Sequence, residues 1–429
     1  MSLCVMREFQ GEFEPVGSFD AVDTSDIIFS YSERYLSQKS AAPLSASLPL
    51  RREPFHSNEY GGFFSGMIPE GPVRAELSTR FQIPQSDYLS MLARLGEECV
   101  GALMFRSDDA VESRAGFRPL TQADADELHK SEIVEIANAM QISRLSLAGA
   151  QSKTGWYLPR SADAKTAGPG QWMLPIGSAP STHIIKVASG KHPDLPTNEQ
   201  VCMDVAQASG LCVAGSFASE VLDNVFISER YDRVWTDGGS IVEGNRTPMR
   251  LHQEDFCQAL GWPSFMKYEN QPNTNYMAMC GRLLREQSSN AIADVQIFGR
   301  QVAIDYLLGN CDSHLKNHSL LLGPNWRSKR LSPAYDIVCT TILGYDHNLG
   351  IDIGDHRVID EVDAKDFEFV AEDLSLPLRR YRAICCEVAE CTKQKLGELS
   401  EASGDLGRVA TQIFGDAAPR IKVLEQFAS

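Results

Sequence analysis

The sequence predicts an α+β protein with a β-rich N-terminal lobe and a helical C-terminal lobe. Short runs of β-branched and aromatic residues, such as DIIFSY at 26–31 and THIIKVA at 182–188, occur in the first half. After residue 250 the apolar residues recur with helical spacing. TDGGSIVEGNRT at 236–247 carries two turn signals and marks the boundary between these parts. Two lobes joined by a short connection enclose a cleft, where ligands usually bind.

Three domains are expected within these lobes. At roughly 150 residues per domain, a chain of 429 residues holds two or three. A polar, acidic stretch follows Phe105 and predicts a linker and then a short helix. We therefore expect a small N-terminal subdomain at 1–107, the β-rich lobe at 108–235 and the helical lobe at 236–429. Residues 161–181 are rich in Ala, Gly, Pro and Ser and predict a mobile loop.

The N-terminal half is expected to alternate short strands and helices. The expected elements are a strand at 26–31, a helix at 86–95, a hairpin over 142–160 that turns at 147–150, a strand at 182–188, a helix that ends at Ala208 and strand-like residues at 215–229. Either Thr197 or Asn198 is expected to cap the second helix, because short polar side chains accept hydrogen bonds from the first turn.

The C-terminal half is expected to consist mainly of helices. They are expected at 253–260, 274–288, 291–308 and 377–396. Phe298, Val302 and Tyr306 follow one another at i, i+4 spacing. Residues four apart lie on the same side of a helix, so these three predict one buried face of the third helix.

The composition is that of a globular protein, and we expect it in the cytoplasm. The chain carries 57 acidic and 40 basic residues, a net charge of −17, which argues against coating of DNA or RNA. No apolar run approaches the ~18 residues of a membrane span, and the N-terminus lacks the regions of a signal peptide, so no membrane partner is expected. The 11 cysteines form no CxxC pair and predict small core residues rather than a disulfide framework or zinc ribbon.

The segment GNCDSHLKN at 309–317 carries the strongest chemical signal. It follows an apolar helix and places Asp312 ahead of Asn317 in the pattern D-x-x-x-x-N. In phosphoryl-transfer loops with this pattern, the Asp accepts the proton of the substrate hydroxyl and the Asn holds Mg²⁺. The alternative is a polar loop that caps two helices, because the pattern also recurs by chance.

Two isolated charges in apolar runs favour the same chemistry. Asp336 stands in LSPAYDIV at 331–338, and a buried carboxylate must be paired or bound to a metal. It fits the second metal-binding carboxylate of a kinase. Lys186 stands alone in a strand, where nucleotide phosphates could neutralise it, with Glu199 as its tether. The alternatives are a capping aspartate after Pro333 and an edge-strand lysine that faces water.

Two further segments are less specific. SLAGAQSKT at 146–154 has small residues that let backbone amides approach phosphates, and Lys153 adds a positive charge. It is not a Walker A loop, because Ser152 stands where that motif requires glycine, and a tight β-turn is the alternative. FISERYDR at 226–233 lies where a kinase hinge would present backbone groups to adenine. An ordinary strand end is the alternative there.

Taken in order, these segments resemble the HipA family, the serine/threonine-kinase toxins of HipAB toxin–antitoxin modules. The matching stretches are SLAGAQSKTGWYL at 146–158, HIIKVA at 183–188, NEQVCMDVAQASGL at 198–211, ISERYDR at 227–233, RLHQEDFCQALG at 250–261, AIDYLLGNCDSHLKNHSLLL at 303–322 and LSPAYDIVCT at 331–340. Residues 66–105 resemble the small N-terminal subdomain of full-length HipA. The resemblance covers most of the chain in the family order and implies a two-lobed protein-kinase-like fold with an all-α C-terminal lobe.

The resemblance also implies roles for individual residues. The residues that it assigns to nucleotide binding are Ala148, Gly149, Ala150 and Gln151 of the phosphate-binding loop, Lys153, Lys186, the hinge residues Glu229 and Tyr231, and His314. Asp312 matches the catalytic aspartate, and Asn317 and Asp336 match the Mg²⁺ ligands. Ser146 matches the serine that these kinases autophosphorylate, which expels the loop and shuts the enzyme off. Gln253 and Glu254 match a QED stretch with a structural or substrate-side role.

By resemblance, the protein is expected to be an ATP- and Mg²⁺-dependent serine/threonine protein kinase that acts as a toxin. The known family targets are aminoacyl-tRNA synthetases, whose phosphorylation stops tRNA charging and arrests growth. The expected partner is a HipB-type helix-turn-helix antitoxin, through which the protein would reach operator DNA as a corepressor. Three alternatives stay open: a small-molecule kinase, a catalytically degenerate kinase-fold binding protein, and a metal hydrolase that uses Asp312, His314 and His318.

Overall fold

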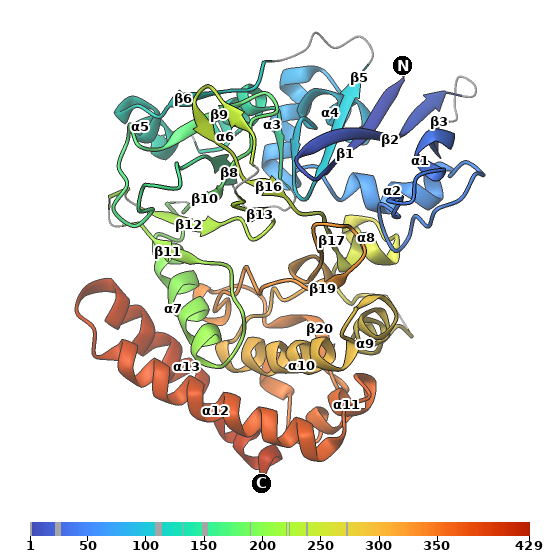
Figure 1. The fold of residues 1–429 in the computed structure, drawn as a ribbon. Helices are drawn as coiled ribbons and strands as arrows, with labels where there is room; N and C mark the ends of the chain where they lie inside the picture. The colour runs from blue at the N-terminus through green and yellow to red at the C-terminus, as the bar shows by residue number, and fades with distance from the viewer. Residues whose placement is uncertain are drawn as a thin grey trace. The chain divides into compact units, whose positions relative to one another are not determined.

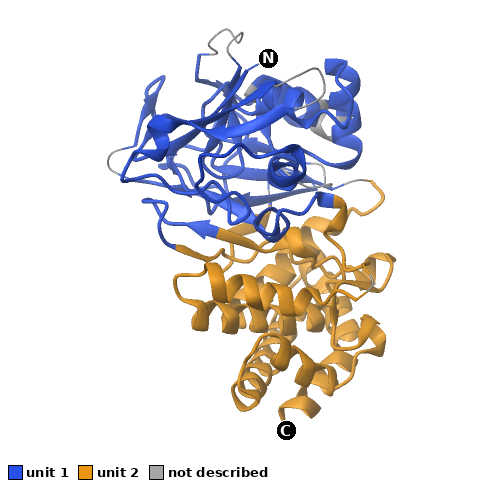
Figure 2. Ribbon diagram, turned by 90° about the vertical axis from the view of Figure 1, so that its right-hand side faces the viewer, with its two compact units in different colours: residues 1–189, 219–264, 321–328 blue, residues 190–218, 265–320, 329–429 orange. Residues whose placement is uncertain are grey.

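The structure is a computed structural model that describes all residues except 1, 22–26, 108–113, 131, 148–152, 189, 220, 223, 237–238 and 272. For residues 127–130, 132, 133, 135 and 143 it describes the backbone alone. Helices and strands alternate along the chain (Figure 1), which confirms the predicted α+β class. The chain folds into two compact units (Figure 2). Unit 1 consists of residues 1–189, 219–264 and 321–328, and unit 2 of residues 190–218, 265–320 and 329–429.

Strands predominate among the elements of unit 1. The strands are β1 (Leu3–Phe9), β2 (Glu12–Ala21), β3 (Ile27–Tyr31), β4 (Glu98–Cys99), β5 (Leu103–Ser107), β6 (Gly116–Pro119), β7 (Leu145–Ser146), β8 (Lys153–Trp156), β9 (Met173–Ile176), β10 (His183–Val187), β12 (Val225–Glu229), β13 (Arg233–Val234), β14 (Ile241–Val242), β15 (Asn245–Arg246), β16 (Met249–Arg250) and β17 (Gln253–Asp255). The helices are α1 (Glu33–Leu36), α2 (Ser57–Ser65), α3 (Gly71–Phe81), α4 (Tyr88–Leu95), α5 (Gln122–Lys130), α6 (Glu132–Ser143) and α8 (Phe256–Leu260).

Helices predominate in unit 2. The α-helices are α7 (Leu195–Ala208), α9 (Tyr276–Gln287), α10 (Ala291–Leu308), α11 (Asp366–Asp373), α12 (Leu378–Ser400) and α13 (Gly404–Ala428). The shorter elements are β11 (Ser216–Ala218), η2 (Leu315–Asn317), β19 (Lys329–Leu331), η3 (Thr341–Leu343), β20 (Asn348–Ile353), β21 (His356–Val358) and η4 (Ile359–Glu361). Two elements, η1 (Ser264–Met266) and β18 (Ser319–Leu322), have residues in both units.

The first part of unit 1 is an antiparallel sheet in the order β3-β2-β1-β5. Successive side chains of a strand point to opposite faces, so one face of β1 buries Leu3 and Val5. Aromatic rings fill the core behind it, with Phe19 lying 5.3 Å from Phe29 and 4.8 Å from Phe64 between ring centroids. The burial of this much apolar surface stabilises this part of unit 1.

The second sheet of unit 1 carries the predicted strand lysine. Within the unit, β10 lies between β12 and β8 and is antiparallel to both. The core side of β10 buries Ile185 and Val187. Lys186 points to the opposite face, because side chains alternate along a strand. The sheet thus presents a lysine at its centre, on a strand that is hydrogen-bonded along both edges.

In unit 2, α10 runs through the interior and is buried on nearly all sides. Phe298, Val302 and Tyr306 are all buried, as their spacing predicted. The helix ends at Gly309, which adopts φ +67° as C-cap and donates to the carbonyl of Tyr306. A Cβ at this position would lie 2.3 Å from the Thr341 hydroxyl, so glycine is required by both backbone angle and space. The predicted catalytic loop begins directly after this turn.

Most predicted elements are confirmed. The strands at 26–31 and 182–188 correspond to β3 and β10, and the helix at 86–95 to α4. The four C-terminal helices appear as α8, α9, α10 and α12, with short paired strands added between them. Seven of the cysteines are buried, as expected of small core residues. The division into domains at 107/108 and 235/236 stays a prediction. Within the described residues, no helix is both long and apolar enough to cross a bilayer.

Three local predictions are wrong. The hairpin over 142–160 does not form, because β7 pairs in parallel with β4 while β8 pairs with β10. Residues 161–181 were expected to be a mobile loop but are not a loop throughout, since β9 pairs with β6 and Trp172 is fully buried. Helix α7 begins at Leu195 after an Asp194 cap rather than at Thr197 or Asn198, because Pro196 suits the first turn of a helix.

Candidate active site

The predicted catalytic loop is clamped by its neighbours in unit 2. The Thr340 hydroxyl accepts the N–H of Cys311 (2.9 Å) and donates to the carbonyl of Gly309 (3.0 Å). Beneath the loop, Asn310 donates through Nδ2 to the fully enclosed carboxylate of Asp305 (2.8 Å). These bonds fix the backbone at both ends of the turn, so that the residue after Cys311 is held in one place.

That residue, Asp312, is exposed, whereas the asparagine of the pattern is buried. Asn317 donates through Nδ2 to the backbone carbonyl of Asp312 at 2.8 Å. The structure therefore brings together the two ends of the D-x-x-x-x-N pattern. The bond uses the amide nitrogen, so the carboxamide oxygen is the atom that Asn317 can offer to a cation. On the Asp312 carboxylate, Oδ1 accepts a hydrogen bond from the Tyr268 hydroxyl at 2.6 Å.

Asp336 lies beside the same loop. The hydroxyl of the preceding residue, Tyr335, donates to the carbonyl of Lys316 (2.9 Å) and contacts the hydroxyl of Ser319 (2.6 Å). Asp336 itself is half-buried and adopts φ +56°, a left-handed conformation that aspartate tolerates better than most residues. A non-glycine residue held in this region indicates a position that its surroundings impose, and such positions are common at functional sites.

The donor atoms of this cluster fit Mg²⁺. Mg²⁺ binds oxygen ligands and is usually held by one or two protein oxygens together with substrate phosphates and waters. Asp336 and Asn317 can supply one carboxylate and one carboxamide oxygen. Asn317 bonds to Asp312, and Tyr335, which precedes Asp336, bonds to Lys316 of the same loop. A nucleotide-bound Mg²⁺ would therefore find suitable ligands in unit 2.

The two histidines of the loop differ in their surroundings. The ring of His314 contacts that of Tyr268 edge-on, with the centroids 5.0 Å apart. His318 packs edge-on against Phe298 of α10 at the same centroid distance. Burial lowers the pKa of His318 to about 3, so this ring is neutral near neutral pH. The metal-hydrolase alternative thus depends on two histidines that contact different elements of the unit.

The predicted phosphate-binding lysines lie opposite each other in unit 1. Lys153 is the first residue of β8 and Lys186 belongs to β10, and the two are direct partners in the antiparallel register. Side chains at opposed positions share a face of the sheet and have Cβ atoms roughly 5 Å apart. Two like charges so placed repel each other, and an anion between them removes that repulsion. Glu199, considered as a tether of Lys186, belongs to unit 2.

Ser146 is fully buried at the end of β7. Its hydroxyl donates to the carbonyl of Met67 at 2.7 Å, and its backbone pairs with Cys99 of β4. Access of this hydroxyl to a phosphate donor therefore requires the separation of β7 from β4. The adjacent loop residues Ala148, Gly149, Ala150 and Gln151 lie outside the described residues.

The predicted hinge follows β12. Glu229 ends that strand with an exposed side chain and pairs with His183 of β10. The hydroxyl of Tyr231 donates to Gln253 Oε1, and Gln253 Nε2 donates to Asp232 at 3.0 Å. Gln253 thus holds the segment that follows the strand, which is the structural role considered for it from sequence. Glu254 is also structural, since its carboxylate accepts the N–H of Ala46.

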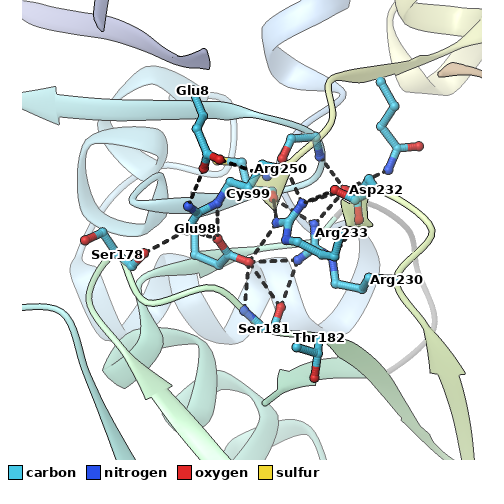
Figure 3. A network of polar contacts seen from close by, with 12 residues as sticks. Glu8, Glu98, Cys99, Ser178, Ser181, Thr182, Arg230, Asp232, Arg233 and Arg250 are labelled. Atoms are coloured by element: carbon cyan, nitrogen blue, oxygen red, sulfur yellow. Dashed lines mark hydrogen bonds and ion pairs between the residues drawn. The ribbon is translucent and has the colours of Figure 1, made fainter. Parts of the chain in front are cut away.

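A buried charge cluster includes residues of the predicted hinge stretch (Figure 3). Glu98 of β4 is fully buried and forms ion pairs with Arg230 (3.0 Å), Arg233 (2.8 Å) and Arg250 (2.7 Å). Asp232 pairs with Arg230 at 2.8 Å and with Arg233 at 3.1 Å. Burial by itself raises the pKa of Glu98, but the three guanidiniums outweigh it and lower that pKa to about 2. Glu98 is therefore ionised at any physiological pH.

The same carboxylate contacts segments next to residues that the sequence predicts to bind nucleotide (Figure 3). Its Oε1 accepts both the N–H and the hydroxyl of Ser181, just before β10, at 3.1 Å. Glu98 also pairs with Leu145, next to Ser146, in the β4–β7 ladder. Glu8 of β1 completes the cluster through Arg250 at 2.9 Å. One buried carboxylate thus links β7, β10 and the hinge.

Sequence reasoning missed these residues. Arg230 and Arg233 were considered only as part of a hinge, and Arg250 only as part of a matching stretch. The signal that could have found them is the placement of several arginines at strand ends, where burial demands an acidic partner. Tyr268 gave no signal, because a lone tyrosine in a polar segment has no distinguishing pattern.

Comparisons with known proteins agree with this arrangement. The family model for the HipA N-terminal domain matches residues 12–106, and that for the HipA-like C-terminal domain matches residues 145–396. The chain is 31% identical over 402 residues to the putative kinase Y4mE of Sinorhizobium fredii, covering 91% of each protein. It is 25% identical over 377 residues to the serine/threonine-protein kinase toxin HipA of Shewanella oneidensis, covering 84% of this chain and 82% of that protein.

A solved structure shares the fold. A complex of HipA, HipB and operator DNA from Shewanella oneidensis contains a chain that matches with a TM-score of 0.77 at 20% identity. The match covers 99% of both chains. The arrangement of elements described above is therefore that of a known fold along its whole length.

Proposed function

Because the chain belongs to the HipA family, we propose that it is a Mg²⁺- and ATP-dependent serine/threonine protein kinase that serves as the toxin of a toxin–antitoxin pair. The observation that carries the proposal is the folding of Asn317 onto the backbone of an exposed Asp312. A positioned, solvent-accessible carboxylate beside a carboxamide is what transfer of a phosphoryl group to a hydroxyl requires.

In the proposed reaction, Asp312 orients the acceptor hydroxyl and takes its proton. The acceptor oxygen bonds to the γ-phosphorus of ATP, the bond to the β-phosphate oxygen breaks, and ADP leaves. Asn317 and Asp336 would hold Mg²⁺, which when bound offsets charge on the phosphate oxygens. Lys153 and Lys186 attract the phosphates, because two opposed lysines form a site of high positive potential. Positioning and electrostatics together account for most of such catalysis.

The remaining binding roles follow the family pattern. We propose that Glu229 and Tyr231 present the hinge to adenine, that His314 lies near the nucleotide, and that residues 148–151 contact the phosphates. Ser146 is proposed as the autophosphorylation site. Its burial at the edge of β7 supports an inactivating role, since a phosphate there cannot fit without displacing the strand.

The proposed partners and location follow from relatives. A HipA of Shewanella oneidensis has been solved in a complex with HipB and its operator DNA. We propose that this chain likewise pairs with a helix-turn-helix antitoxin and reaches operator DNA mainly through it, as a corepressor. The net charge of −17 supports the proposal that the antitoxin makes most of the DNA contacts, because an acidic protein is poorly suited to bind DNA by itself. An aminoacyl-tRNA synthetase in the cytoplasm is the proposed substrate.

The first experiment is to map phosphate on the purified chain. The protein is treated with a phosphatase, freed of it and incubated with ATP and MgCl₂, beside Asp312→Asn. Intact mass and peptide mass spectrometry should find phosphate on Ser146 in the wild type and not in the variant. Phosphate in both would indicate a contaminating kinase and contradict the role of Asp312.

Two other outcomes would favour the alternatives. Nucleotide binding without any transfer, with Ser146 verified as unmodified, would favour the degenerate binding protein. Phosphorylation of a sugar or an aminoglycoside, without any protein acceptor, would favour the small-molecule kinase. Incubation with a panel of purified aminoacyl-tRNA synthetases then tests the proposed substrate class by the same mass measurement.

A further inference from the structure

The side chain of Tyr268 occupies a hydrogen-bonding position on Asp312 that a kinase needs for its substrate. Its hydroxyl donates to Asp312 Oδ1 at 2.6 Å, a length typical of a strong bond from a hydroxyl to a carboxylate. In phosphoryl transfer the catalytic aspartate accepts such a bond from the acceptor hydroxyl. The phenol of Tyr268 is therefore a chemical stand-in for the hydroxyl of serine or threonine.

The backbone around Tyr268 is fixed to the catalytic loop. The carbonyl of Lys267 accepts the N–H of Leu315 at 3.2 Å, and the N–H of Glu269 donates to the carbonyl of Gly350 at 2.9 Å. The buried carboxylate of Glu269 also accepts the N–H of Tyr276 at 2.9 Å. Both residues that flank Tyr268 are thus held by backbone hydrogen bonds. The distance between this segment and Asp312 is set by the fold.

The side chain of Tyr268 is partly exposed, so a change of rotamer can release its hydroxyl from Asp312. Tyr268 is 38% exposed, and its ring contacts the His314 ring by its edge and lies near the Lys267 ammonium. Rotation about χ1 can carry the phenol away from Asp312 without any movement of the backbone. Such rotations of exposed side chains take place within nanoseconds. Phe265, three residues earlier, is 75% exposed and adds a second aromatic side chain to the segment.

We propose that Tyr268 is an acceptor gate, which holds Asp312 until a protein segment with a serine or threonine hydroxyl displaces it. This inference rests on the proposed kinase function and names the class of its acceptor. Water or a small alcohol offers one hydrogen bond in exchange for the one it breaks. A polypeptide segment also packs against the exposed rings of Phe265 and Tyr268. That extra contact offsets the free energy needed to displace the Tyr268 hydroxyl from Asp312.

The gate changes no atoms in the reaction. When the phenol has moved away, the acceptor hydroxyl donates to Asp312, loses its proton to that carboxylate and bonds to the γ-phosphorus, while ADP leaves. Tyr268 keeps its proton throughout. It therefore acts by competing for Asp312, which sets the energy threshold that an acceptor must exceed.

The test is Tyr268→Phe, which removes the hydroxyl and keeps the ring. Hydrolysis of ATP in the absence of an acceptor should rise about tenfold, because water no longer has to displace the Tyr268 hydroxyl from the charged carboxylate of Asp312. With a synthetic peptide of residues 140–152 as acceptor, KM for the peptide should fall several-fold while KM for ATP stays unchanged. Tyr345→Phe, which alters another exposed tyrosine of unit 2, is the matched control and should leave all three values unchanged.

The outcomes separate the gate from the kinase function. Unchanged or reduced hydrolysis in Tyr268→Phe, with an active wild type, would overturn the gate and leave the kinase proposal intact. Phosphate found on Tyr268 would also overturn it, since the residue would then be an acceptor. If the wild type neither hydrolyses ATP nor transfers phosphate, both proposals are wrong. Thermal melting of each variant verifies that the chain is folded.

Discussion

Each unit contains a cluster of charged residues, and the central carboxylates of the two clusters differ in their burial and in their partners. In unit 1, Glu98 is fully buried and is neutralised by three arginines at 2.7–3.0 Å. In unit 2, Asp312 is exposed and its carboxylate accepts a bond from the neutral hydroxyl of Tyr268. The charge of Glu98 is satisfied by the chain itself. The carboxylate of Asp312 is exposed, so an outside partner can reach it.

The difference separates a structural cluster from a chemical one. A buried carboxylate that already has three cations cannot accept a proton at neutral pH, and its function is to hold segments together. An exposed carboxylate on a clamped backbone can do so, because its position is fixed and a substrate can reach it. Substitution should therefore impair stability in the first cluster and activity in the second.

The largest effect is expected for Asp336→Asn. As a proposed ligand, this carboxylate would hold a Mg²⁺ ion that contributes several kcal/mol to the transition state, so its loss should lower phosphoryl transfer by about 10³-fold. Asparagine tolerates the left-handed backbone at this position, so melting should be unchanged. Initial rates of Ser146 phosphorylation and thermal melts measure the two effects. Asp355→Asn, at an exposed position of unit 2, is the control; equal rates in both variants would contradict the site.

Glu98→Gln should have the converse effect. It leaves buried guanidiniums without a full counter-charge, so unit 1 should lose about 3–5 kcal/mol of unfolding free energy. All five tryptophans, Trp156, Trp172, Trp235, Trp262 and Trp326, belong to unit 1. Denaturation followed by tryptophan fluorescence therefore reports on this unit.

The matched control for Glu98→Gln is Glu254→Gln. Glu254 is also a buried carboxylate of unit 1, but the donors bonded to it are the neutral Ser45 hydroxyl and the N–H of Ala46. Its loss should cost about 1–3 kcal/mol. If Glu98→Gln were no more destabilising than this control, the charge cluster would not be the main support of the hinge.

A smaller and two-sided effect is expected for Lys153→Gln. Removal of one of two opposed like charges should stabilise the sheet by about 0.2–1 kcal/mol. The same change should raise KM for ATP about tenfold, because one of the two charges proposed to bind phosphate is lost. Lys165→Gln, at an exposed position of unit 1, should change neither value. A loss of stability together with unchanged KM would indicate that Lys153 is a structural residue.

The sequence was most informative where a residue's role depends on its neighbours along the chain. Asp312 and Asn317 were recognisable because a single loop contains both. Phe298, Val302 and Tyr306 were recognisable because apolar residues recur every four positions along one helix. Glu98 and its arginines come from β4, the residue after β12, β13 and β16, which meet only in the folded chain. No local pattern encodes such a meeting. The failed hairpin at 142–160 has the same cause, since β7 pairs with a strand almost fifty residues earlier.

A further expected effect concerns pH and separates the two clusters once more. Burial raises the pKa of Asp305, which lies beneath the catalytic loop, from 3.8 to about 6. A carboxyl group whose pKa is raised by folding binds more protons in the folded chain than in the unfolded chain. Its contribution to folding stability is therefore complete below pH 3.8 and is lost as the pH rises through about 6. Glu98, with its lowered pKa, behaves in the opposite way: its stabilisation is present above 4.5 and is lost as the pH falls towards about 2.

Asp305→Asn should therefore gain stability relative to the wild type between pH 4 and pH 7. The gain is at most about 3 kcal/mol, because each pKa unit corresponds to about 1.4 kcal/mol. Asparagine can keep the bonds to Asn310 and Ser313, since its oxygen accepts one and the serine hydroxyl can turn to accept from its amide. Denaturation followed by far-UV circular dichroism measures the helical unit 2. The difference between the two proteins isolates Asp305 from His318, which titrates in both. A difference that does not change with pH would show that Asp305 is ionised throughout this range, as Glu98 is.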